Sequence, residues 1–231
     1  MNKQASIEAV ISTVPSGSSI MIGGFGNPGT PFTLINELLK QGQRKLTLIK
    51  NDANEASIGI SKLIENGQVD KLITSHIGLN KIVIEMMNNQ QIDVDFYPQG
   101  ILAEKIRNAG AGCFGFLTDI GIDTEITDRE QLINWQGQQL KIESALYADF
   151  AFIHAKRADC YGNLQYGSSA MNFNPLMAMA ADTVIVETPN IVSAGVLIPE
   201  QIHTASAFVN AVVEIDNLID DYQLLEAHIG H

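Results

Sequence analysis

A glycine-rich loop, residues 23–29, is the part of this sequence best suited to bind an anion. The apolar residues 20–22 before it predict a buried strand, and residues 32–41 after it predict a helix. We expect Thr30 to cap that helix and Pro31 to be its first residue. A loop with bare backbone at a helix N-terminus offers main-chain N–H groups to a phosphate, a carboxylate or a developing oxyanion.

One interpretation of the loop is a dinucleotide site. Gly24, Gly26 and Gly29 have the spacing G-x-G-x-x-G, and Asp52 follows a second apolar run at 46–49, where an acid would bind a ribose. These residues are compatible with an NAD-dependent oxidoreductase. A glycine-rich turn that binds no ligand is also compatible with them, because short motifs of this kind arise without a function.

Polar residues follow several of the later apolar runs. Asn51, His76, Gln99 and Gly100 all come shortly after a predicted strand. In open α/β sheets the ligand crevice lies outside the carboxyl ends of the strands, so these residues can meet at one substrate pocket. Asn51 and Gln99 can donate and accept, which suits a carboxylate or a carbonyl, and His76 is a candidate general base. Hydrogen bonding to the local backbone is the alternative role for each of them.

The rest of the chain alternates short apolar runs with helical stretches, which indicates an α/β fold with an open, largely parallel sheet flanked by helices. Residues 118–146 are expected to form a small β-rich excursion from that sheet. We expect residues 1–231 to form a single domain. The further predicted strands are 71–74, 94–97, 150–154, 183–186 and 209–215, and the further predicted helices are 6–14, 57–66, 82–88, 102–109 and 174–181.

Composition excludes several classes of function. A formal net charge of −12 argues against a nucleic-acid surface, which needs clustered Lys and Arg. No apolar stretch has the length of a membrane span or the form of a signal peptide, so we expect a cytoplasmic protein with no membrane partner. The two cysteines and five histidines have no metal-ligand spacing, and we expect no metal site.

Several ordered motifs resemble those of one family. Gly23-Gly24-Phe25, three further residues and Gly29-Thr30-Pro31 resemble the G-G-F-x-x-x-G-x-P signature of the alpha subunits of family I CoA-transferases. Residues 75–78, Ser-His-Ile-Gly, are more similar to the acetate/acetoacetate (3-oxoacid) branch than to the 3-oxoadipate branch. Met171 departs from the family, where arginine is commoner. Further similar segments are 46–52, 98–100, 109–112, 147–151, 159–166, 172–175 and 180–182.

The resemblance implies a ping-pong reaction. CoA moves from a short-chain acyl-CoA (acetyl-, acetoacetyl-, butyryl- or succinyl-CoA) to a free carboxylic acid through a glutamyl-CoA thioester. CoA is then a substrate, and no permanently bound cofactor is expected. The CoA-binding residues that it implies are Gly23, Gly24, Phe25, Gly26, Asn27, Pro28 and Gly29. A non-catalytic acyl-CoA binding module is the remaining alternative.

In the family, the nucleophilic glutamate lies in a Ser-Glu-Asn-Gly motif on a beta subunit. This chain has Glu65-Asn66-Gly67, but Ile64 precedes it, and Asn and Gly are ordinary helix-stop residues. We therefore expect Glu65 to face solvent and no catalytic residue to lie in this chain. A beta subunit is the expected partner, and residues 110–116 are the candidate contact. The alternative is that Phe114 and Phe116 pack into the chain's own core.

Overall fold

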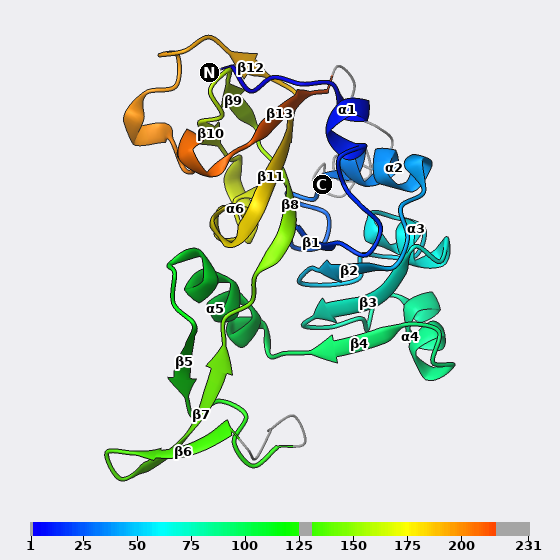
Figure 1. Ribbon diagram of the computed structural model, residues 1–231, viewed down its shortest axis with the longest axis vertical. Helices are drawn as coiled ribbons and strands as arrows, with labels where there is room; N and C mark the ends of the chain where they lie inside the picture. The colour runs from blue at the N-terminus through cyan, green and yellow to red at the C-terminus, as the bar shows by residue number, and fades with distance from the viewer. Residues whose placement is uncertain (1, 125–130, 216–231) are drawn as a thin grey trace, which may run out of the picture.

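The structure is a computed structural model that describes residues 2–124 and 131–215. Within these residues, seven parallel strands form the main sheet in the order β13-β11-β8-β1-β2-β3-β4 (Figure 1). The predicted α/β class with a largely parallel sheet is confirmed. The strands are β1 (Ser19–Ile22), β2 (Leu46–Ile49), β3 (Val69–Thr74), β4 (Asp93–Phe96), β8 (Ala148–His154), β11 (Ala181–Thr188) and β13 (Ala211–Glu214).

Helices cover both faces of this sheet (Figure 1). One face carries α1 (Ile7–Ile11), α2 (Phe32–Gln41), α3 (Ile60–Glu65) and α4 (Lys81–Asn88), and the other carries α5 (Gln99–Gly110) and α6 (Asn174–Ala180). Successive residues of a strand point to opposite faces, so Ile20 and Ile22 join the first core while Met21 joins the second. Burial on both faces explains why the strands are continuous apolar runs.

The centre of the sheet is a switch point of the chain. Strand β1 pairs with β2 on one side and with β8 on the other, and the chain builds outward from β1 in both directions. Ligands of such sheets bind outside the carboxyl ends of the strands at this point. The loop 23–29 leaves β1 there and leads into α2.

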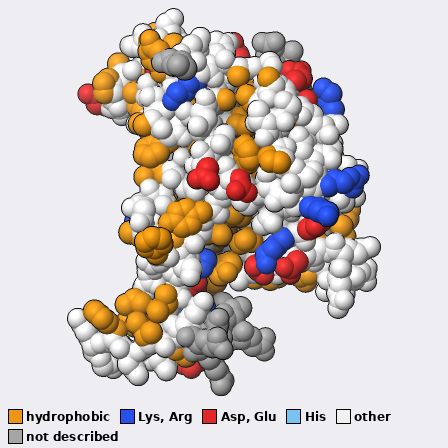
Figure 2. Space-filling model, in the orientation of Figure 1, with side chains coloured by type: hydrophobic (Ala, Val, Ile, Leu, Met, Phe, Trp, Pro, Cys, Tyr) orange, Lys and Arg blue, Asp and Glu red, His pale blue; other side chains and the backbone are white. Residues whose placement is uncertain are grey.

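A second, antiparallel sheet extends from the main body (Figure 1). It consists of β5 (Gly115–Thr118), β7 (Gln138–Ser144) and β6 (Leu132–Trp135), in that order. It confirms the predicted excursion at 118–146, of which residues 125–130 lie outside the described part. Hydrophobic side chains gather on this projecting sheet and beside it (Figure 2), and the exposed ones are Phe114, Leu117, Ile120, Trp135 and Ile142.

Phe114 is 92% exposed, so the alternative that it packs into the chain's own core is wrong. Phe116 is half-buried within β5. An aromatic side chain left this exposed is uncommon on a free surface and is suited to contact with another chain.

A third, small sheet was not predicted. It joins β10 (Leu164–Gln165), β9 (Arg157–Asp159) and β12 (Ile191–Val192), whose strands are too short for a pattern of alternation to show in the sequence. Several helix ends also differ from prediction. Helix α1 ends at Ile11 instead of residue 14, α3 begins at Ile60 instead of residue 57, α5 begins at Gln99 instead of residue 102, and Ala181 starts β11. Of the helices in the described ranges, none combines the length and apolar character needed to span a membrane.

Candidate functional site

The loop 23–29 is fixed to the sheet at its start and folded back on itself at its tip. The N–H of Gly23 donates to the carbonyl of Phe152 in β8 at 2.9 Å. The N–H of Phe25 donates to the carbonyl of Pro28 at 3.1 Å, which closes a turn. The loop is therefore a fixed surface at the switch point of the sheet.

The glycines of this loop have different roles. A Cβ on Gly23 would lie 1.9 Å from Oδ1 of Asn174 in α6, and a Cβ on Gly29 would lie 2.5 Å from the carbonyl oxygen of Ala170. These two glycines let the loop pack closely against the chain. Gly26 has φ +59°, and a Cβ there would meet no described heavy atom within 4 Å. Gly26 is thus the glycine of this loop that faces open space, whereas Gly29 does not.

Thr30 does not cap α2. The helix begins at Phe32 with Pro31 as its N-cap residue, and no side chain of the N-cap residue bonds to the helix. The Thr30 hydroxyl instead donates to the carbonyl of Gly26 at 2.7 Å, and a Cβ on Gly24 would lie 2.2 Å from that hydroxyl oxygen. The threonine therefore turns back into the loop, which corrects the sequence-based expectation.

A buried glutamate from a distant strand takes the place of the predicted cap. Oε2 of Glu187, at the end of β11, accepts the N–H of Leu34 in the first turn of α2 at 2.9 Å. Oε1 of Glu187 lies 2.9 Å from Nδ1 of His154. Complete burial raises the pKa of Glu187 above its usual value, although His154 and the backbone N–H groups of Leu34 and Thr33 oppose the shift.

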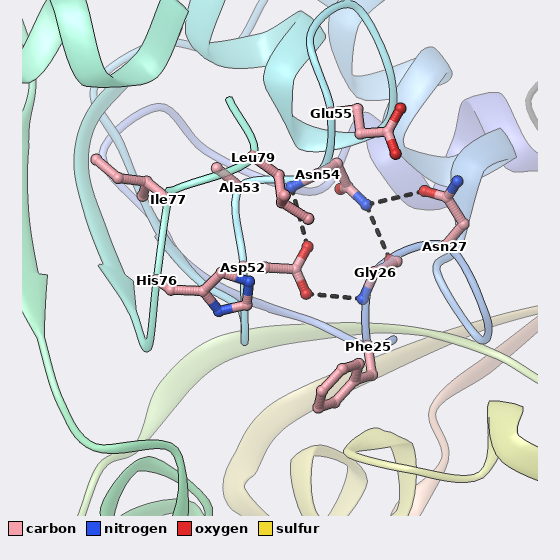
Figure 3. A pocket seen from close by; sticks show the side chains of 10 residues that line it. All are labelled: Phe25, Gly26, Asn27, Asp52, Ala53, Asn54, Glu55, His76, Ile77 and Leu79. Atoms are coloured by element: carbon pink, nitrogen blue, oxygen red, sulfur yellow. Dashed lines mark hydrogen bonds between the residues drawn. The ribbon is translucent and has the colours of Figure 1, made fainter. Parts of the chain in front are cut away.

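The N–H and the carbonyl of Gly26 both form hydrogen bonds with side chains of the residues that follow β2. The N–H of Gly26 donates to Oδ2 of Asp52 at 2.7 Å. Its carbonyl accepts Nδ2 of Asn54 at 2.9 Å and Nζ of Lys50 at 3.1 Å, in addition to the Thr30 hydroxyl. Figure 3 shows the contacts of Asp52 and Asn54 with the loop. Four side chains hold this one residue, so the loop tip is preorganised.

Lys50 and Asp52 form a buried ion pair below the loop. Nζ of Lys50 lies 3.5 Å from Oδ1 of Asp52, and the two side chains are 0% and 7% exposed. Burial lowers the pKa of Lys50, and the carboxylate opposes that shift. Burial alone would raise the pKa of Asp52, but Lys50 and three donated hydrogen bonds outweigh it and hold this pKa below its usual value. The close approach of the amino group and the carboxylate favours the ionised form of each.

The hydrogen bonds of Asp52 also remove the basis of the dinucleotide interpretation. Its two oxygens accept the N–H groups of Gly26 and Asn54 at 2.7 and 3.0 Å and Nδ2 of Asn51 at 3.2 Å. A buried carboxylate with these partners stabilises the loop and has no free face for a ribose. The spacing of the acid was therefore a misleading signal.

Asn51, Ser75 and Gln99 meet at the carboxyl ends of β2 and β3 and the start of α5. Oδ1 of Asn51 accepts Nε2 of Gln99 at 3.0 Å and the Ser75 hydroxyl at 3.1 Å. Nδ1 of His76 lies 3.2 Å from the same hydroxyl. Gly100 lies beside Gln99 in the exposed first turn of α5. The structure thus brings these residues close together, as expected for strand ends of one sheet edge.

A small pocket of about 120 Å³ opens between the loop and the ends of β2 and β3 (Figure 3). Typical ligand pockets measure roughly 300–1,000 Å³, so this space suits a small acyl group better than a nucleotide. Of the residues expected at the site, it includes Phe25, Gly26, Asn27 and His76. Its other lining residues are Asp52, Ala53, Asn54, Glu55, Ile77 and Leu79.

Glu65 lies at the exposed end of α3, as expected from the sequence. Its carboxylate accepts the Ser61 hydroxyl at 2.6 Å and the N–H of Ser57 at 2.7 Å. These local hydrogen bonds hold the Glu65 side chain at the end of the helix. It does not line the pocket beside Gly26.

Three residues that hold the loop or the start of α2 were not identified from the sequence: Lys50, Asn54 and Glu187. Lys50 directly follows the apolar strand β2 and Glu187 lies within the apolar strand β11, where a buried charge needs a partner, and this was the available signal. Asn54 has φ +56° and belongs to a polar run that is indistinguishable from an ordinary loop in the sequence.

Comparison with known proteins agrees with these observations. The family model described as coenzyme A transferase matches residues 4–215. A probable coenzyme A transferase subunit alpha of Bacillus subtilis (strain 168) is 45% identical over 94% of this chain and 95% of that protein. The acetate CoA-transferase subunit alpha of Escherichia coli (strain K12) is 45% identical over 85% of this chain and 90% of that protein.

A solved structure shows the same fold at lower sequence identity. An acyl-CoA transferase of Escherichia coli O157:H7, in a thioester complex with CoA, superposes with a TM-score of 0.82 at 22% identity. The match covers 94% of this chain but 48% of that one, so this chain spans about half its length. With the family match along nearly the whole described chain, these relatives show that the protein belongs to the coenzyme A transferases and is one of their alpha subunits.

Proposed function

We propose that this alpha subunit serves a transferase that moves CoA between a short-chain acyl-CoA and a free carboxylic acid. The observation that carries the proposal is the fixed peptide at Gly26 beside a pocket of about 120 Å³. A rigid backbone next to a small space suits the oxygen of a small acyl group. The relative from Escherichia coli K12, named for acetate, supports a short-chain substrate.

The loop residues Gly23 to Gly29 and the group of Asn51, His76, Gln99 and Gly100 are the proposed contacts for CoA and substrate. Their position at the carboxyl edge of the sheet supports this assignment. The tightly packed glycines would shape the loop, while Phe25, Gly26 and Asn27 would touch the ligand. CoA binds as a substrate that leaves after each cycle.

The attacking group is proposed to be a glutamate of a beta subunit with a Ser-Glu-Asn-Gly motif. Its carboxylate oxygen forms a bond to the thioester carbon, and the electron pair of the C=O bond moves to the acyl oxygen. When this tetrahedral species collapses, the C–S bond breaks, CoA leaves as a thiolate, and a mixed acyl–glutamyl anhydride remains. The thiolate then attacks the glutamyl carbonyl of this anhydride, whose C–O bond breaks to release the donor acid as a carboxylate and leave the glutamyl-CoA thioester. The free acid released is later replaced by the acceptor acid in the reverse sequence.

The exposed apolar surface beside β5, which includes Phe114, is the proposed contact with this partner. The length of the acyl-CoA transferase of Escherichia coli O157:H7, about twice that of this chain, supports a need for a second half. We further propose that residues 1–231 act as one domain and that the enzyme is cytoplasmic.

The test is to purify this chain alone and with its beta subunit, and to measure CoA transfer from acetoacetyl-CoA to acetate. We expect activity in the complex and none in the isolated chain. Glu55→Gln provides a matched control, because Glu55 is the exposed acid that lines the pocket. Full activity of that variant agrees with a nucleophile on the partner. Activity of the isolated chain, or CoA binding without any transfer by the complex, would contradict the proposal.

A further inference from the structure

The peptide bond between Gly26 and Asn27 is polarised from one side. Its carbonyl oxygen accepts hydrogen bonds from Thr30 at 2.7 Å, Asn54 at 2.9 Å and Lys50 at 3.1 Å. A carbonyl has two lone pairs, so three donors are more than it usually receives. One of the three is a charged ammonium group with no exposed surface, and in a buried site its field is weakly screened.

The opposite end of this peptide faces away from these donors. The structure contains no cis peptide bond in its described ranges, and in a trans peptide the N–H is antiparallel to the C=O. Because the Gly26 carbonyl points toward the buried side chains, the Asn27 N–H points away from them. Within residues 2–124 and 131–215 this N–H donates to no protein acceptor. Asn27 is half-buried and lines the pocket.

Polarisation at one end of a peptide acts at the other end. Donors on the carbonyl increase the double-bond character of the C–N bond and withdraw electron density from the nitrogen. The Asn27 N–H is therefore a stronger donor than an ordinary backbone amide. Asp52 also lies near the Lys50 ammonium group, but its carboxylate oxygen is 3.5 Å from Nζ, farther than the Gly26 carbonyl oxygen. That carboxylate already accepts hydrogen bonds from Asn51 and from two backbone N–H groups.

We propose that the Asn27 N–H stabilises the acyl oxygen when it becomes negative, and that Lys50 is a positioning residue that strengthens this donor through the Gly26 carbonyl. The inference rests on the proposed CoA transfer. The negative charge on that oxygen exists only in the tetrahedral species, so the benefit belongs to the chemical step and not to substrate binding. Lys50 itself touches no substrate.

The test is Lys50→Met in the complex with the beta subunit. Methionine fills similar space without a charge, and Asp52 keeps its three other donors. Removal of an oxyanion donor lowers kcat by roughly 100-fold or more, so weakening one should lower kcat about tenfold, with KM changed less than about twofold. Lys105→Met is the matched control, since Lys105 is 7% exposed and paired with Glu143 at 2.9 Å. That variant should retain kcat within about twofold.

A spectroscopic readout separates polarisation from a merely structural effect. With this chain labelled with 15N-asparagine in the complex, the Asn27 amide proton should lie at lower field in the wild type than in Lys50→Met, and acetate should move it further downfield. Thr30→Val, which removes a neutral donor from the same carbonyl, should produce a smaller shift and a smaller loss of kcat, and serves if Lys50→Met does not assemble.

The outcomes distinguish this inference from the proposed function. A wild-type complex that transfers no CoA would refute the function, while the amide shift would still report on Lys50. An active complex in which Lys50→Met keeps full kcat, or in which the Asn27 proton resonates at the same field in both proteins, would overturn the inference. An increase in KM with unchanged kcat would also overturn it.

Discussion

The substitution Asp52→Asn should lower the free energy of unfolding far more than the small change in side-chain shape suggests. Oδ2 of Asp52 accepts Gly26 and Asn51, and Oδ1 accepts Asn54 and lies near Lys50. An asparagine side chain replaces one of these oxygens by an NH₂ group, which cannot accept, so one pair of contacts is lost. The substitution also leaves the buried ammonium of Lys50 without its counter-ion.

Removing one partner of a buried ion pair costs about 3–5 kcal/mol in the free energy of unfolding, and we expect a loss in that range. Urea unfolding of the isolated chain, followed by circular dichroism, measures it. The control is Asp93→Asn, because Asp93 pairs with Lys71 at 3.0 Å with 67% of its side chain exposed. An exposed pair contributes less than about 1 kcal/mol. Adding Lys50→Met to Asp52→Asn removes the unpaired cation and should restore more than about 1 kcal/mol.

The same comparison has a defined pH dependence. The folded-state pKa of Asp52 lies below its usual value, so its stabilising contribution is complete above the unfolded pKa of about 4 and is lost as pH falls through the folded value. The difference in the free energy of unfolding between wild type and Asp52→Asn should therefore become smaller below about pH 4. A loss of less than about 1 kcal/mol at pH 7, or no recovery in the double variant, would refute the assigned role of the ion pair.

Three further predictions test the loop, the exposed acid and the surface near β5. Gly29→Val should destabilise the chain by more than about 2 kcal/mol, because the neighbouring backbone leaves no room for the side chain. Gly26→Ala should cost about 1 kcal/mol because of the positive φ at this position, and should chiefly reduce CoA transfer. Thermal melts and CoA-transfer assays compare the two variants, and equal melting temperatures would contradict this difference. Glu65→Ala should change the free energy of unfolding by no more than about 0.5 kcal/mol and leave turnover intact, and loss of turnover in a folded variant would place the nucleophile on this chain. Phe114→Asp should fold but fail to associate with the beta subunit in light scattering, while Phe208→Asp, at another exposed phenylalanine, should still associate; normal assembly of the first would exclude Phe114 from the interface.

Local patterns predicted the central elements of the fold well. Strand β2 spans the predicted residues 46–49 and helix α2 the predicted residues 32–41, because an apolar run and an amphipathic stretch are each bordered by clear breaks. Pro31, expected as the first helical residue, is instead the N-cap residue. The small sheet of β9, β10 and β12 was missed, since strands of two or three residues carry no periodic signal. The N-terminus of α5 was placed too late because Gln99 and Gly100 resemble loop residues.

The candidate site was predictable in its position but not in its contacts. Strand ends located Asn51, His76 and Gln99, which the topology then brought to one edge. Thr30 appeared to be a helix cap because its type fits that role, yet the cap of α2 comes from Glu187 in a strand distant in sequence. Glu187 can replace Thr30 as the cap because the fold brings β11 close to α2, and no local pattern in the sequence contains that proximity. Asp52 was misassigned for the same reason, because its partners include residues from two separate loops.

The order of strands in the main sheet also determines when the protein can complete its core during synthesis. Strands β1 to β4 are consecutive in the chain and can pair as soon as they emerge, but β1 also pairs with β8, in a register that joins Met21 to Ala151. Until β8 has been made, β1 is therefore an unpaired edge strand of the nascent sheet, although it is central in the finished one. Such an edge is a template for pairing with other chains, and slow closure of contacts this far apart prolongs the exposure. Truncation before residue 148 should consequently yield aggregates, and chaperones that bind extended apolar segments should engage this chain before its second half is synthesised.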